Sequence, residues 1–224
     1  MSSQLDSTAV AEYLLDHPHF FEEHSELLAR VKLTSPLAGR TVSLQERQME
    51  VLREKNRTLE LRLAELIRIA QENDAITHKM LAWTQSLLLA RNDVDLPHTL
   101  ANGLQTLFDV PHATLRLWGV SEQFSHTWFA AGVSEDARLF SSSLVAPYCG
   151  PNQDFEAAGW LEDGADVKSV ALIPLGAESG SQRRVFGLLV LGSPDPQRFA
   201  PDMATDFLAQ IGETASAAVA CLME

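Results

Sequence analysis

Three histidines near the N-terminus are the first residues whose type and spacing could do chemistry. His17 and His19 flank Pro18, and His24 follows shortly after. Imidazoles so close together are good ligands for zinc and related metals. No cysteine or fourth histidine lies nearby, however, and a proline in this place is typical of a turn between two helices. We therefore expect a turn here and no metal site.

The two cysteines, Cys149 and Cys221, are the next candidates. They are too few and too far apart in sequence for a disulfide framework or a four-ligand zinc site. Cys149 lies in a stiff turn, Pro147-Tyr-Cys-Gly-Pro151. A reactive thiol would need a nearby cation or helix N-terminus to lower its pKa, and the sequence shows neither. The interpretation is a buried structural thiol, with contact to a bound ligand as the alternative.

Aromatic residues gather in the same irregular segment, between residues 137 and 167. If this segment covers one face of a sheet, its aromatic side chains would line a small-molecule pocket, because such pockets are mainly apolar. Ordinary core packing would use the same residues, so both interpretations stay open. The candidate ligand pocket consists of Phe140, Tyr148, Cys149 and Trp160.

Motifs of the common catalytic classes are not found. Gly176-Ala-Glu-Ser-Gly180 lacks the spacing of a nucleophile elbow, and neither a phosphate-binding glycine loop nor a His-Glu-x-x-His helix occurs. We therefore predict a protein that is not an enzyme, with no catalytic residues, no metal ligands and no cofactor that the sequence specifies. A cluster assembled only in space, from Arg116, His126, Asp154 and Cys149, is the enzymatic alternative.

The net charge limits the partners. The 224 residues include 17 Lys and Arg against 30 Asp and Glu, a formal charge of −13. A chain this acidic repels nucleic acid unless its cations gather in one patch. Between residues 40 and 68 seven cations stand against five glutamates, but the signs are interleaved along one expected helix. This favours a solvated helix face, so we expect no nucleic-acid partner.

The apolar residues are spread along the whole chain. No run approaches the roughly 20 apolar residues that a membrane-spanning helix needs. The first residues have neither the basic flank nor the apolar core of a signal peptide. Two isolated cysteines suit a reducing compartment. We expect a cytoplasmic protein with no membrane partner.

Short helices followed by a linker are expected in residues 1–39. Apolar residues recur at helical spacing as far as Val31, with an interruption at Pro18. Helices of this size are too small to bury a core of their own. We therefore expect Phe20 and Phe21 to dock elsewhere in a dimer or on a protein partner.

A long helix is predicted from Ser43 to Arg91. Ser43 and Glu46 have the spacing of a capping box, and neither proline nor glycine interrupts the segment. At 1.5 Å per residue the helix would be about 70 Å long, far longer than a helix in a globular domain. Residues 40–91 are therefore assigned to a coiled coil.

Apolar residues along this helix alternate in steps of three and four, the pattern of a left-handed coiled coil. Asn56 at an a position favours two parallel strands, and Lys55 and Glu60 would face each other with opposite charges. One break in the heptad, at Leu66, is a stammer. The alternative is that the stripe packs on the chain's own domain. The predicted dimer seam comprises Met49, Leu52, Asn56, Leu59, Leu63, Leu66, Ile69, Asn73, Ile76, Met80, Trp83 and Leu87.

Residues 92–224 are expected to form an α+β domain. A helix ends near Asp109, and a closing helix begins at Pro201. The last expected strand is apolar on both faces and belongs at the centre of the sheet. The order predicts an antiparallel sheet flanked by helices. Strands are expected at Ala113–Trp118, Thr127–Ala131, Ser169–Leu175 and Arg184–Gly192.

The C-terminal pattern resembles a known fold. The runs Ser169-Val-Ala-Leu-Ile-Pro-Leu175 and Phe186-Gly-Leu-Leu-Val-Leu-Gly192, followed by Arg198-Phe199, resemble the second half of a GAF domain. Many small-molecule sensors use this fold. The signature of GAF domains that bind cyclic nucleotides is not recognisable, so that ligand is not indicated.

The N-terminal half carries a sharper resemblance. Tyr13-Leu14, His17-Pro18 and Phe20-Phe21 precede Val42-Ser43-Leu44-x-Glu46-Arg47-Gln48, the most specific piece. These residues are similar to an uncharacterised GAF-like family of proteobacterial proteins, a domain-of-unknown-function family. The resemblance spans nearly the whole chain. It implies a long helix before a GAF-like domain and a bacterial cytoplasmic setting, and it brings no established activity.

Two functions follow from these expectations. The first is a non-catalytic parallel homodimer that acts as a small-molecule sensor or signalling adaptor of unknown ligand. The second is a ligand-free structural or protein-interaction module, whose N-terminal helices would present Phe20, Phe21 and Leu27 to a protein partner.

Overall fold

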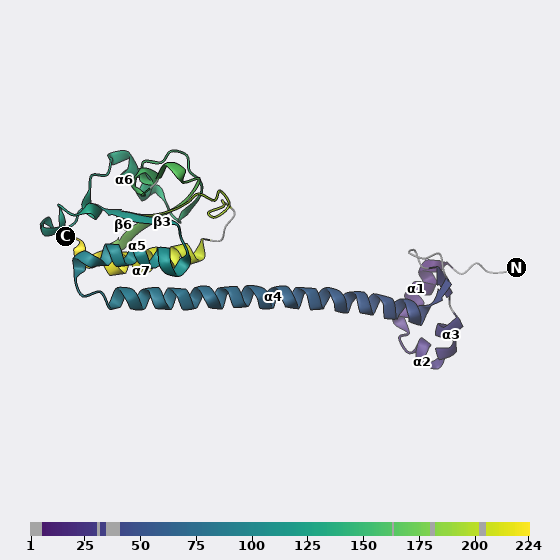
Figure 1. Cartoon of the computed structure of the whole chain (residues 1–224). Helices are drawn as coiled ribbons and strands as arrows, with labels where there is room; N and C mark the ends of the chain where they lie inside the picture. Colours follow the sequence, from purple (N-terminus) through teal and green to yellow (C-terminus); the bar gives the residue numbers. More distant parts are fainter. Residues whose placement is uncertain (1–5, 31, 35–40, 163, 180–181, 202–204) are drawn as a thin grey trace. The chain divides into compact units, whose positions relative to one another are not determined.

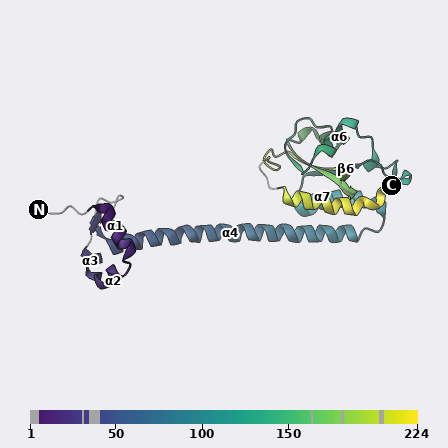
Figure 2. The same cartoon turned by 180° about the vertical axis from the view of Figure 1, so that it is seen from behind.

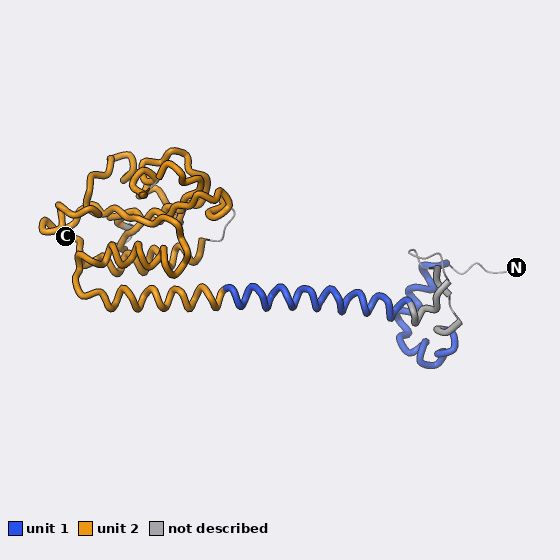
Figure 3. Tube along the Cα trace, viewed as in Figure 1, with its two compact units in different colours: residues 1–72 blue, residues 73–224 orange. Residues whose placement is uncertain are grey.

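The computed structural model describes residues 6–30, 32–34, 41–162, 164–179, 182–201 and 205–224. The chain divides into two compact units, Met1–Glu72 and Asn73–Glu224, which are coloured separately in Figure 3. The division falls inside one long helix, α4 (Leu44–Leu88).

The first unit begins with three short helices and a small hairpin. Asp6 caps the first helix, because its carboxylate accepts a hydrogen bond from the Thr8 backbone at 3.1 Å. The sequence predicted two helices here. Of the linker expected up to Gly39, residues 35–39 lie outside the described residues. The elements are α1 (Ser7–Asp16), α2 (Phe20–Glu23), α3 (Ser25–Arg30), β1 (Lys32–Thr34) and β2 (Thr41–Ser43), with β1 and β2 antiparallel.

The turn between α1 and α2 is built from aromatic rings. The His17 ring stacks on Tyr13 at 4.2 Å between centroids, and the Tyr13 carbonyl lies 3.0 Å from His17 Nδ1. Phe20 makes edge contact with Phe21 at 5.4 Å and lies 4.8 Å from the His24 ring. Two of the three histidines therefore pack against aromatic side chains at this turn.

The long helix α4 runs from Leu44 to Leu88, close to the predicted Ser43 to Arg91. Acidic and basic side chains spaced three or four residues apart pair along it, as Arg68 does with Glu65 at 2.7 Å. Such exposed pairs contribute little to helix stability, because water and salt screen the charges. None of the described helices is long and apolar enough to cross a membrane.

The second unit is an antiparallel sheet flanked by helices. The strand order is β3-β6-β5-β4, so β3 and β4 are the edges. Helices α5 and α7 lie on one face of the sheet and α6 lies on the other, as Figures 1 and 2 show from opposite sides. The elements are α5 (Leu96–Phe108), β3 (His112–Leu117), α6 (Glu135–Ser143), β4 (Tyr148–Pro151), β5 (Ser169–Ser179), β6 (Gln182–Ser193) and α7 (Asp206–Val219). The predicted α+β class is confirmed.

Side chains alternate across the two central strands and build a core on each face. On β5, Ile173 is buried toward α5 and α7, whereas Leu172 is buried toward α6. On β6, Leu189 is likewise buried toward α5 and α7, and Leu188 toward α6. Burial on both faces is the reason that these strands read as continuous apolar runs in the sequence. The central place predicted for the last strand is confirmed.

Two local predictions were wrong. The strand expected from Thr127 to Ala131 is a single 3-10 turn, Trp128–Ala130. Its Phe129 side chain is fully buried on the face of the sheet that α5 and α7 cover. In addition, most of the turn expected from Pro147 to Pro151 is a strand, β4, which contains Gly150 and Pro151. A proline is tolerated there because β4 is an edge strand and Pro151 is its last residue.

The C-terminal part of α4 is anchored in the second unit by Trp83. This side chain is fully buried, and its indole N–H donates to the Leu100 carbonyl of α5 at 3.2 Å. The ring lies against Gly103, where a Cβ would be 2.5 Å from Trp83 Cδ1. Only a residue without a side chain lets α5 approach the indole so closely.

We predict that Gly103→Ala lowers the free energy of unfolding by about 1 to 2 kcal/mol, because the added methyl overpacks a buried ring that cannot move aside. Gly132→Ala is the matched control, since a Cβ there has no heavy atom within 4 Å. It should change stability by less than about 0.5 kcal/mol. Urea unfolding followed by circular dichroism measures both, and equal stability of the two variants would contradict the packing described.

Candidate functional site

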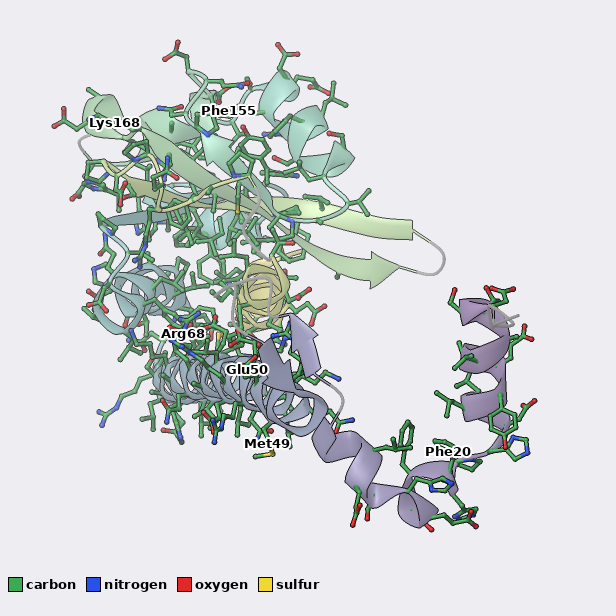
Figure 4. The ribbon with its side chains drawn as sticks, turned by 90° about the vertical axis from the view of Figure 1, so that its right-hand side faces the viewer. Phe20, Met49, Glu50, Arg68, Phe155 and Lys168 are labelled. Carbon is green, nitrogen blue, oxygen red and sulfur yellow. The ribbon has the colours of Figure 1, made fainter. Side chains whose placement is uncertain are left out.

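The face of the sheet opposite α5 and α7 carries Phe140 and Tyr148, two of the four residues predicted to form a pocket. Phe140 of α6 and Tyr148 of β4 both contact Phe155, with ring centroids 5.5 and 5.3 Å apart. Figure 4 shows Phe155 on the side of the sheet away from α7. Two of the four predicted residues are thus brought together by a third aromatic residue that the sequence analysis did not select.

The space beneath this aromatic cluster is small. A hollow of about 260 Å³ lies between α6, Phe155 and the central strands, with Leu172 and Leu188 at its base. The rest of this sheet face is covered by buried side chains such as Ala157 and Leu161. The volume is below the roughly 300 to 1,000 Å³ typical of ligand pockets. The aromatic cluster is therefore better described as core than as a ligand site.

Cys149 lies on the other face of the sheet. It follows Tyr148 on β4, and neighbouring residues of a strand point to opposite sides. Its side chain is buried in the core formed with α5 and α7, and this burial raises the pKa of the thiol to about 11. Cys149 therefore cannot contact a molecule held near Phe140 and Tyr148.

Trp160 lines a different and larger hollow, of about 450 Å³, at the open edge of β3. One wall is the exposed side of α5, and the floor is β3 itself. The hollow is also lined by Trp128 and Glu162 from the loops that follow β3 and β4. The α5 wall consists of His98, Ala101, Asn102 and Gln105, and the β3 floor consists of His112, Ala113, Thr114 and Arg116.

Arg116 is the central charge of this hollow. Its guanidinium carbon is 5.8 Å from the ring centroid of Trp128 and 5.8 Å from that of Trp160, within the range of cation–π attraction. No carboxylate of the described residues pairs with it. Burial between the rings lowers the pKa of Arg116, because the charged form loses water. The side chain nevertheless stays charged, because the guanidinium of arginine is protonated at every physiological pH.

The start of α6 is tied to the loop that carries Trp160. Ser134 caps α6 by accepting from the Ala137 backbone at 3.1 Å, and its hydroxyl donates to the carboxylate of Glu156. The hydrogen bonds that Glu156 accepts from the hydroxyl and the backbone N–H of Ser134, together with a weaker one from the Trp160 indole, lower the pKa of Glu156. The carboxylate thus fixes the loop before Trp160 against the first turn of α6.

The predicted dimer seam divides into two parts in the structure. Trp83 and Leu87 are buried in the core of the second unit, so for them the packing on the chain's own domain is observed. Ile76 and Met80 are half-buried, and Asn56 and Asn73 are exposed. Figure 4 shows Met49 projecting from α4. The exposed apolar members, with 41% to 63% of their surface accessible, are Met49, Leu52, Leu59, Leu63, Leu66 and Ile69.

The described residues offer little for metal or catalytic chemistry. No three His, Cys, Asp or Glu side chains among them are grouped as metal ligands. Arg116 lines the hollow at β3, whereas His126, Asp154 and Cys149 do not, so these four residues do not converge there. No pattern pointed to Trp128 as a site residue, because Thr127–Ala131 was expected to form a strand.

The α+β domain behind a long helix defines the class of this protein, and comparison with known families defines its membership. The chain belongs to the family described as protein of unknown function, DUF484, whose model matches residues 1–219. A relative from Salmonella typhimurium, the uncharacterized protein YigA, is 27% identical over 215 residues, which is 93% of this chain and 88% of that protein. The family resemblance found in the sequence is thereby confirmed.

The similar solved structures include GAF domains. One, from Acinetobacter phosphoenolpyruvate-protein phosphotransferase, has 15% identity and a TM-score of 0.45 and covers 67% of this chain and 93% of that one. Another, from Pseudomonas syringae pv. tomato, has 16% identity and a TM-score of 0.43 and covers 69% of this chain and 91% of that one.

We predict that the two cysteines differ sharply toward a thiol reagent. With dithionitrobenzoate at pH 8, the exposed Cys221 should react in the folded protein, and the buried Cys149 only after unfolding in guanidinium. The absorbance of the released thiolate measures both phases. Cys221→Ser should remove the reaction of the folded protein, and rapid labelling that persists in this variant would show that Cys149 is accessible.

A pH dependence is expected from Glu156. Because the pKa of its carboxylate is lower in the folded protein, the ionised form stabilises folding above the ordinary value of 4.5, and this contribution is lost as the pH falls below it. Glu156→Gln removes the titrating group. Urea unfolding at a series of pH values should therefore show wild type losing stability relative to the variant below about pH 4.5. A constant difference would show that the hydrogen bonds to Ser134 are not formed in solution.

Proposed function

We propose that this protein is a non-catalytic, parallel homodimer in which a GAF-like domain responds to a small molecule and passes the response to a coiled coil. The observation that carries the proposal is the position of α5. One side of α5 packs on Trp83 of α4, and another side lines the hollow at Arg116. A molecule in the hollow would therefore press on the element that holds α4.

The coiled coil is supported by the residues that α4 leaves exposed. Six apolar side chains from Met49 to Ile69 follow the heptad positions, and no described residue covers them. The occupant proposed for this face is a second copy of the chain. Asn56 at an a position favours parallel register, and Lys55 of one strand would lie opposite Glu60 of the other. The seam from Met49 to Ile69 would be about 30 Å long.

Signal transfer requires that a ligand binds two states of the dimer with different affinity. The packing of Trp83 against Gly103 is tight enough to transmit a shift of α5, because a Cβ at Gly103 would already collide with the ring. The break of the heptad at Leu66 is where α4 could have two arrangements of similar energy. A ligand that moves α5 would change the balance between them.

A ligand-free interaction module is the second candidate. It is favoured by the sheet face under α6, which is filled by side chains and leaves only about 260 Å³. In that case the N-terminal aromatic residues Phe20 and Phe21 would carry the function by docking on a protein partner.

The dimer is tested with charges placed in the seam. Leu59→Glu together with Leu63→Glu should convert the protein to a monomer, because both partners would bury like charges at adjoining core positions. Sedimentation equilibrium of the full chain measures the change, and we expect the dissociation constant of the dimer to rise by at least about a hundredfold.

The matched control places the same two charges elsewhere on the same helix. Val51 and Leu61 are also exposed and apolar, but they lie at c and f positions, away from the seam. Val51→Glu together with Leu61→Glu should remain dimeric. If the control dissociates equally, or if wild type is a monomer at micromolar concentration, the coiled-coil proposal is wrong.

A further inference from the structure

We propose that the hollow at the edge of β3 binds a small organic monocarboxylate, with its carboxylate on the Arg116 guanidinium and its apolar body against Trp128 and Trp160. The proposal deepens the function proposed above, because it names the class of molecule that the domain would sense. The sensing role of this site rests on the proposed function, whereas the binding site itself rests on the geometry of the second unit.

The donors of Arg116 are only partly used. A guanidinium has five N–H groups, and among the described residues the side chain of Arg116 makes one hydrogen bond, from Nη1 to the Leu115 carbonyl at 3.3 Å. No described carboxylate pairs with it, although Glu162 lines the same hollow. The remaining donors form a planar fork, which matches the two oxygens of a carboxylate. The partly desolvated position between two rings strengthens such a bond.

The walls favour a flat apolar body over a second charge. Two tryptophan rings and the methyl groups of Ala101 and Ala113 supply apolar surface in a hollow of about 450 Å³, which is within the range of ligand pockets. Arg116 is the only permanent cation of the lining, and the carboxylate of Glu162 opposes further negative charge. A doubly charged phosphate ester therefore fits less well than a single carboxylate.

Polar groups of α5 and β3 can select among carboxylates. Asn102 and Gln105 present amides on the α5 wall, and Thr114 presents a hydroxyl from the floor. These groups can both donate and accept hydrogen bonds. A hydroxyl or carbonyl substituent on the ligand body would find partners there.

An added peptide strand suits the edge of β3 less well. The Trp118 backbone N–H donates to the Phe186 carbonyl of β6. Along β3, the backbone N–H and C=O groups of every second residue therefore pair with β6, and those of the residues between them point to the open edge. The carbonyl of Leu115 is one of the outward groups, and Arg116 already covers it. This use of a charged side chain protects an edge against pairing.

The test uses the full chain labelled with nitrogen-15, whose four tryptophans each give one indole signal. Trp128→Phe and Trp160→Phe identify the two signals from the hollow. Sodium benzoate is the probe, and benzamide is its uncharged isostere, both at constant ionic strength. We expect benzoate to shift both signals in a saturable way, and benzamide to bind at least about tenfold more weakly.

Substitutions then test whether the guanidinium of Arg116 binds the carboxylate of benzoate. Arg116→Gln should weaken benzoate binding by at least about tenfold. Arg138→Gln is the matched control, because the Arg138 guanidinium also lies over a tryptophan, Trp118 at 6.0 Å, but outside the hollow. It should bind benzoate as wild type does. Glu162→Gln should bind more tightly, since a competing negative charge is removed.

Several outcomes would overturn the site: no saturable shift, equal binding of benzamide, or unchanged affinity in Arg116→Gln. A saturable, Arg116-dependent shift with inorganic phosphate but not with benzoate would refute the carboxylate assignment. If Arg116→Gln does not fold, Arg116→Lys replaces it. That variant keeps the charge and loses the fork, and it should bind several-fold more weakly than wild type.

Sedimentation of the dimer with and without benzoate separates this site from the proposed function. Indole shifts without any change in dimer dissociation would leave the carboxylate site standing and count against the sensor. Dimers that form through the seam but bind no benzoate would refute the site alone.

Discussion

The contact between Trp83 and Gly103 is the constraint on which the second unit depends. An indole can be fully buried here only if the neighbouring helix leaves space for it, and α5 leaves that space because Gly103 has no side chain at the point of contact. The hydrogen bond from the indole to Leu100 then fixes the ring, so that the polar atom of a buried tryptophan is satisfied. As a result, the C-terminal part of α4 is part of the domain core.

The same contact sets the position of the candidate site. On α5, Leu100, Gly103 and Leu104 are buried, whereas Asn102 faces the hollow at β3. A helix places residues two apart on different sides, so α5 can serve the core and the hollow together. The Arg116 hollow therefore has one wall whose position follows from the packing of Trp83. This is a physical link between the proposed ligand site and the helix that carries the exposed seam.

The sequence predicted most elements but not what covers their apolar faces. The double burial of β5 and β6 left a continuous apolar run that is visible in the sequence, and α5 was found from its helical spacing. In contrast, the steps of three and four that lead to Trp83 and Leu87 suit both a coiled-coil seam and packing on α5. Periodicity shows that a face must be buried, and it does not identify the partner. Only the three-dimensional structure shows that Trp83 is buried in the domain core and that Leu59 is exposed.

The candidate site was harder to predict for a related reason. Tyr148 and Cys149 were predicted to share a pocket because both lie in the segment expected to cover one sheet face, but neighbouring residues of a strand point to opposite faces. Once β4 was read as a turn, this alternation could not be used. Trp128 and Trp160 lie in short 3-10 turns that have no periodic signal, and they meet Arg116 only through the folding of separate loops.

An acidic chain with a charge of −13 also constrains what a single arginine can bind. At physiological ionic strength the repulsion from distant carboxylates is screened beyond about 8 Å, so a small anion in the hollow experiences mainly Arg116, Glu162 and the two indole rings. A polyanion extends past that distance and meets the acidic surface. The charge that leads us to expect no nucleic-acid partner is therefore compatible with the carboxylate site proposed at Arg116. Selection by size and charge would follow from the fold without any further recognition element.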